Sequence, residues 1–261
     1  MSLTASALLT ATGVFIGMLV LFEAGRRLGI ATMARDPDGK PSGAGPAEAA
    51  VFGLLGLLLA FTFSGAASRF EARRHLVTEE ANAIGTAYLR VDLLPADAQP
   101  EMRQLFRRYL DTRLETYTRP GDRDFIRAKL AEAGELQQAI WNLAIAAGQR
   151  EPAGHTARVL LPALNAMIDI TTTRVTATET HPPEIIFILL AGLSLVSALL
   201  VGYVASTATT RNMVPILILA TTLALTLYVI LDLEFPRQGL IRVNSADHVL
   251  AELRQSMEQT P

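Results

Sequence analysis

The chain has 261 residues, no cysteine and a formal net charge of −2, and 50% of it is hydrophobic while 18% is charged. The absence of a cationic surplus argues against nucleic-acid binding, and the absence of cysteine excludes disulfides, thiol catalysis and thiolate metal sites. The hydrophobic excess favours insertion into a lipid bilayer.

The first uncharged segment runs from Met1 to Phe22 and predicts a first membrane-spanning helix. A cleavable signal peptide is the alternative. However, its start lacks the basic residues of such a peptide, and Arg26 and Arg27 follow the apolar run instead. We therefore expect the helix to be retained. Residues 23–47 are rich in Pro, Gly, Asp and Arg, which predicts an irregular connector.

The second apolar segment is the one around which the rest of the chain is organised. The 20 residues from Ala49 to Ser68 carry no charge, which suffices to cross the ~30 Å hydrocarbon layer at ~1.5 Å per residue. Small side chains recur at every fourth position, at Gly56, Ala60 and Ser64. They predict a narrow stripe on which a neighbouring helix can pack closely.

A second stripe lies beside the small residues and consists of Gly53, Leu57 and Phe61. Residues four apart follow one another along a helix face, so this stripe presents a short apolar wall. The wall faces either lipid or one shared feature of an assembly.

A polar block, residues 69–183, contains no apolar run long enough to span a membrane. Its first part has no proline until Pro95, which predicts that the membrane helix continues outward as a stalk. Apolar residues at helical spacing predict a helix after Pro100, another over residues 125–144 and a third over 155–179. No alternating pattern predicts a strand.

Two further spans close the chain, at residues 185–207 and 213–231, joined by a tight connection at Arg211 and Asn212. A weakly amphipathic tail covers 245–257. The predicted class is an all-α membrane protein with four transmembrane helices and an extramembrane helical bundle. Its four parts are spans one and two (1–68), the helical domain (69–183), spans three and four (184–233), and a tail on the same side as that domain (234–261).

Nothing in the sequence predicts an enzyme, a cofactor or a metal site. The four histidines are scattered outside ligand-like spacing. Asn165 and Asp169 share a helix face, where a hydrogen-bonded pair is favoured over a cation site. Glu79, Glu80 and Asn82 lie on the stalk, and a ring of copies would make them a polar vestibule; solvated or salt-bridged carboxylates are the alternative. No ionisable residue lies within a span, which argues against proton relays and most ion-coupled transporters.

The string LLAF at Leu58–Phe61, followed by Arg69, Phe70 and Arg74, resembles the second membrane helix of bestrophins and the basic, aromatic segment after it. The string EEANAIGTAYLRVDLLP at Glu79–Pro95, with the closing helix pair, resembles a bacterial family of unknown function described as bestrophin-like. The second resemblance covers most of the chain.

Bestrophins are homopentameric ion channels whose second helices line a narrow hydrophobic neck. The resemblance therefore implies a homopentamer in the inner cell membrane that conducts inorganic ions, with its neck at Gly53, Leu57 and Phe61. Two positions depart from the bestrophin pattern: Glu71 replaces a second aromatic residue, and Gly53 replaces a bulky apolar one. Arginines near the two membrane faces are nearly balanced, so a cytoplasmic helical domain is implied by the resemblance alone. An apolar neck indicates neither anions nor cations.

The alternative hypothesis is a non-conducting membrane scaffold or sensor whose helical domain binds another protein. Apolar helices and an amphipathic bundle serve both purposes equally well. Stoichiometry distinguishes the two, because a monomer or dimer cannot enclose a pore lined by second helices. An enzyme acting on lipid is a third hypothesis, without a recognisable reactive group.

Overall fold

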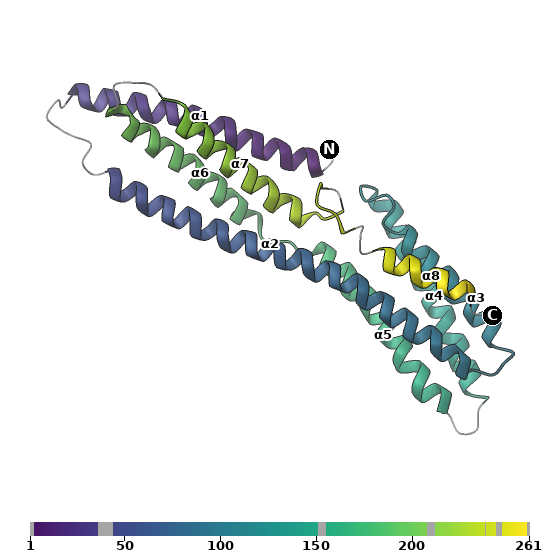
Figure 1. Ribbon diagram of the computed structural model, residues 1–261. Helices are drawn as coiled ribbons and strands as arrows, with labels where there is room; N and C mark the ends of the chain where they lie inside the picture. The colour runs from purple at the N-terminus through teal and green to yellow at the C-terminus, as the bar shows by residue number, and fades with distance from the viewer. Residues whose placement is uncertain are drawn as a thin grey trace. The chain divides into compact units, whose positions relative to one another are not determined.

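The computed structural model describes residues 3–35, 44–150, 155–207, 212–237, 239–243 and 247–259, and all regular secondary structure within them is helical. Four helices within these ranges are long and apolar enough to cross a membrane, as the sequence predicted. The helices in chain order (Figure 1) are α1 (Leu3–Arg35), α2 (Ala44–Leu89), η1 (Arg90–Leu93), α3 (Gln99–Glu115), α4 (Arg123–Gly148), α5 (His155–Glu179), α6 (Glu184–Val204), η2 (Ala205–Thr207), α7 (Val214–Glu234) and α8 (His248–Gln259).

The chain divides into two compact units, each with its own core. We call them the apolar unit, Met1–Arg69 with His181–Phe235, and the polar unit, Phe70–Thr180 with Pro236–Pro261. Helix α2 contributes its first part to the apolar unit and its second part to the polar unit. This agrees with the sequence, which predicted one helix continuing beyond the second span.

Helices α1, α6 and α7 form the body of the apolar unit, and α1 lies beside both of the others (Figure 1). Large apolar side chains from these helices, together with one from α2, meet in a common core. Its largest members are Val14, Met18, Phe22, Leu55, Leu190, Ile216, Leu223 and Leu227.

The first helix is longer than the sequence predicted. Helix α1 continues from Glu23 to Arg35, so the predicted irregular connector is wrong for this stretch; residues 36–43 lie outside the described residues. Gly25, within this stretch, lies against α6. A Cβ added at Gly25 would come within 2.9 Å of the Leu199 carbonyl carbon. Glycine here permits backbone-to-backbone packing of two helices, which is typical of membrane interfaces.

Gly202 makes the reciprocal approach from α6, because a Cβ there would overlap the backbone of Phe22 in α1. We expect Gly202→Ala to destabilise the apolar unit by about 1–3 kcal/mol, the usual cost of overpacking. Gly192→Ala, in the same helix, is the matched control because its Cβ would meet no atom within 4 Å. The measurement is the fraction of detergent-solubilised protein that stays monodisperse in size-exclusion chromatography after heating. Equal losses for the two variants would contradict this packing.

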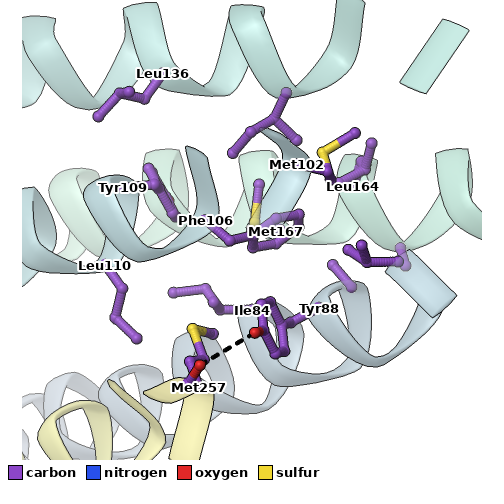
Figure 2. Packing of buried hydrophobic residues seen from close by; sticks show 14 of the residues in the cluster. Ile84, Tyr88, Met102, Phe106, Tyr109, Leu110, Leu136, Leu164, Met167 and Met257 are labelled. Atoms are coloured by element: carbon purple, nitrogen blue, oxygen red, sulfur yellow. Dashed lines mark hydrogen bonds between the residues drawn. The ribbon is translucent and has the colours of Figure 1, made fainter. Parts of the chain in front are cut away.

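The polar unit is a bundle of the second part of α2 with α3, α4, α5 and α8 around one apolar core. Figure 2 shows side chains from all five helices meeting there, and Tyr88 of α2 donates a hydrogen bond of 3.3 Å to the Met257 carbonyl of α8. The start of α4 is capped by Asp122, which accepts a 2.9 Å hydrogen bond from the Phe125 amide. Labelled core members are Ile84, Tyr88, Met102, Phe106, Tyr109, Leu110, Leu136, Leu164, Met167 and Met257.

Candidate functional site

The membrane-spanning part of α2 is the least covered of the four apolar helices. Only 11% of its most apolar 18-residue stretch is buried within the chain, whereas 28–33% of the corresponding stretch is buried in the other three helices. Leu55 and Ala66 are buried, and Leu58 and Leu59 are partly buried against the apolar core. One narrow face therefore attaches α2 to its own chain, and the rest of its circumference is free for other contacts.

The stripe of Gly53, Leu57 and Phe61 lies on the free side of α2. At about 100° per residue these positions point away from Leu55 and Ala66. Leu57 is 54% exposed and Phe61 is 68% exposed, and a Cβ added at Gly53 would meet nothing within 4 Å. The chain itself therefore leaves the whole apolar wall uncovered.

The small-residue stripe of Gly56, Ala60 and Ser64 is exposed as well. A Cβ added at Gly56 would meet nothing within 4 Å, so none of the described helices uses this stripe for close packing. Close packing inside the described part of the chain relies instead on Gly25 and Gly202. The sequence placed Gly25 in a predicted loop, and nothing near Gly202 in its apolar span marked it as a contact. The α2 stripe remains available to a second molecule.

An ion pair fixes α2 where its uncharged segment ends. Arg69 of α2 donates from Nε to Glu234 at the end of α7, at 2.9 Å to one carboxylate oxygen and 3.2 Å to the other. Glu234 is buried, and His181 Nδ1 lies 3.6 Å from its Oε2. From the sequence, Arg69 entered only through the bestrophin resemblance, and Glu234 was not singled out. Arg69 and Glu234 carry opposite charges, and each lies at the end of a predicted span. This was the sequence signal that could have suggested the ion pair.

The three predicted vestibule residues have different environments. Glu79 is exposed, and its Oε1 lies 3.2 Å from Nδ1 of His75. Asn82 is exposed on the rim of a shallow groove between α2 and α5. Glu80 is fully buried in the polar unit, where its carboxylate accepts hydrogen bonds from Arg113 at 2.5 Å and from Arg174. The vestibule interpretation is therefore wrong for Glu80, and the salt-bridged alternative holds.

The polar pair on α5 also has a simple structural role. Asn165 donates a hydrogen bond of 3.4 Å to Asp169, and both side chains are exposed. Among the residues that the structure describes, no three His, Asp or Glu side chains gather closely enough to hold a metal ion. The hydrogen-bonded interpretation of this pair agrees with the geometry.

These features can be compared with known proteins. The protein-family model for the bestrophin-like domain matches residues 27–247, which is most of the chain. The chain belongs to the bestrophin-like family. The bestrophin family and fold are in general those of ion channels rather than enzymes. The matched range includes α2 with both exposed stripes. No curated protein sequence matches this bestrophin-like chain.

The fold of the bestrophin-like chain is shared with solved structures. One is a bacterial bestrophin homologue from Klebsiella pneumoniae with a tryptophan-to-alanine mutation, at a TM-score of 0.66 and 15% identity over 95% of this chain and 97% of that one. A tyrosine-to-alanine mutant of the homologue matches at a TM-score of 0.65 and 16% identity, over 95% of this chain and 100% of the other. The TM-scores establish a common fold, and at 15–16% identity the likeness extends to the fold alone.

Proposed function

We propose that this bestrophin-like chain forms an oligomeric ion channel in the inner cell membrane, with a hydrophobic neck lined by Gly53, Leu57 and Phe61 of α2. The observation that carries the proposal is the uncovered apolar face of α2, which lies opposite the face that attaches α2 to its own chain. Family membership supports passive ion conduction as the purpose of such a face. The same helix offers Gly56, Ala60 and Ser64 for packing against the next copy.

A ring of five α2 helices would have room for these side chains at its axis. Helices packed about 8–10 Å apart in a ring of five have their axes roughly 7–8.5 Å from the centre. Subtracting the backbone radius of about 2.3 Å leaves roughly 5–6 Å for side chains and the pathway. Side chains as long as Leu57 and Phe61 fill most of that space, so small rotations can open or close it.

An apolar constriction can stop ions without any charge, because water leaves a narrow hydrophobic segment and an ion cannot cross it unhydrated. Leu57 and Phe61 would form such a gate, and Gly53 would leave the neck wider at its own level. Exposed Glu79 and Asn82 would line a polar vestibule on the polar-unit side, which we place in the cytoplasm.

Native mass spectrometry of the particle in mild detergent tests the proposal. We expect a single species with the mass of five chains, because a ring of five leaves an axial path that Leu57 and Phe61 can nearly close. A monomer or dimer that is stable under these conditions would contradict a pore along α2. That outcome would support the scaffold or sensor instead, whose polar unit would bind another protein.

A further inference from the structure

A cluster of three arginines surrounds one tyrosine within the polar unit, separate from the proposed neck. The guanidinium carbons of Arg113, Arg174 and Arg237 lie 5.9, 4.9 and 4.0 Å from the centre of the Tyr117 ring. Arg113 comes from α3, Arg174 from α5, and Arg237 from the segment after α7. Three cations that meet inside one bundle need compensation from nearby anions.

Among the described residues, two carboxylates supply negative charge to this cluster. Glu80 binds Arg113 and Arg174, as described above. Asp247 accepts hydrogen bonds of 2.9 and 3.1 Å from Arg237 and lies 3.3 Å from Arg174 Nη2. Three guanidiniums against two carboxylates leave one positive charge in excess.

Arg113 is the member of this cluster whose hydrogen bonding is incomplete. Its side chain is 0% exposed, and only Nε reaches Glu80. Among the residues that the structure describes, neither Nη1 nor Nη2 has a hydrogen-bond partner, and the buried hydroxyl of Tyr117 also lacks one. Burial disfavours the charge, but the Glu80 carboxylate outweighs burial and raises the pKa of Arg113 above its ordinary value. Arg113 therefore stays cationic.

The missing partner of Arg113 must be an acceptor, since a guanidinium has donors only. Buried polar groups are nearly always satisfied by protein, water or an ion. A neutral water would fill the donor positions but leave the net charge of the cluster, three guanidiniums against two carboxylates, unbalanced in a poorly solvated interior. A small anion meets both requirements. We propose that the Nη1–Nη2 edge of Arg113 binds a small monovalent anion, with chloride as the form to test, independently of the proposed neck.

Anomalous scattering from bromide tests the site directly. Bromide replaces chloride with similar size and charge, and its position in crystals of the full-length protein can be located without any mutation. We expect a bromide peak within hydrogen-bonding distance of Arg113 Nη1 or Nη2. A fully ordered water at that edge, with no bromide signal, would overturn the proposal.

Thermal unfolding in chloride and in gluconate, at constant ionic strength, provides the second test. We expect chloride to raise the melting temperature of the unmodified protein in a saturable manner and to have no such effect on Arg113→Gln. Arg119→Gln is the matched control, because Arg119 is exposed and contacts Phe125 outside the cluster. The same chloride response in all three proteins would overturn the proposal.

A milder variant avoids the risk that Arg113→Gln fails to fold. Tyr117→Phe keeps the ring between the arginines and removes only the unpartnered hydroxyl. We expect it to raise the half-saturating chloride concentration by roughly fivefold, the usual effect of losing one hydrogen bond. An unchanged half-saturating concentration would contradict a binding site that includes Tyr117.

Discussion

We expect Phe61→Ala to increase ion flux through reconstituted vesicles by about tenfold or more. Phe61 is the most exposed large side chain of the proposed neck, and alanine would remove most of the apolar volume that it places near the axis. A tenfold rise corresponds to a permeation barrier lower by about 1.4 kcal/mol, which is modest for partial rewetting of a hydrophobic constriction. The measurement is the initial rate of ion release from vesicles that contain equal amounts of each protein.

Phe63→Ala is the matched control for this change. Phe63 is also aromatic and is 44% exposed. It lies two residues after Phe61 in α2, which places it on nearly the opposite side of the helix. We expect flux through Phe63→Ala to equal that of the unmodified protein. If Phe61→Ala leaves flux unchanged while the assembly keeps its mass, Phe61 is not the gate.

We expect Glu80→Gln to lower the free energy of unfolding of the polar unit by about 3–5 kcal/mol, because it leaves two buried guanidiniums without their carboxylate. Arg113 and Arg174 both bind Glu80, and all three residues are buried. Glutamine keeps the shape of the side chain, so the loss reports charge rather than packing. Trp141, the single tryptophan, packs against the polar-unit core and can report this unfolding by its emission.

Glu79→Gln is the control for Glu80→Gln, one residue earlier in the same helix. Its side chain is 46% exposed and contacts only an exposed histidine among the ion pairs of the described residues. Pairs of this kind contribute little to stability, so we expect a change within about 0.5 kcal/mol. Equal effects of the two substitutions would show that the buried Glu80 pairs do not stabilise the unit.

Local patterns predicted much of this fold because the relevant physics is local. Twenty uncharged residues in succession, as at Ala49–Ser68, are enough to identify a membrane-spanning helix. The extension of α2 to Leu89 followed from the absence of proline, and α3 begins at Gln99 beside Pro100, as predicted. Helical periodicity also predicted which α2 residues share a face, and the structure shows both stripes exposed.

Features that depend on pairing between distant segments could not be read in this way. Glu80 was predicted to lie in a polar vestibule, with a solvated or salt-bridged carboxylate as the alternative, but Arg113 and Arg174, 33 and 94 positions away, enclose it. Gly25 suggested a loop because nothing nearby in sequence reveals the backbone of α6 beside it. Whether Leu57 and Phe61 meet copies of themselves depends on other molecules, so neither the sequence nor one chain determines it.

The most direct test is an image reconstruction of the solubilised particle viewed along its symmetry axis, at a resolution that separates side chains. We predict five α2 helices around the axis, with Leu57 and Phe61 pointing inward and Gly56, Ala60 and Ser64 against the adjacent copy. Leu57 and Phe61 pointing outward into the surrounding detergent or lipid would contradict a pore lined by α2.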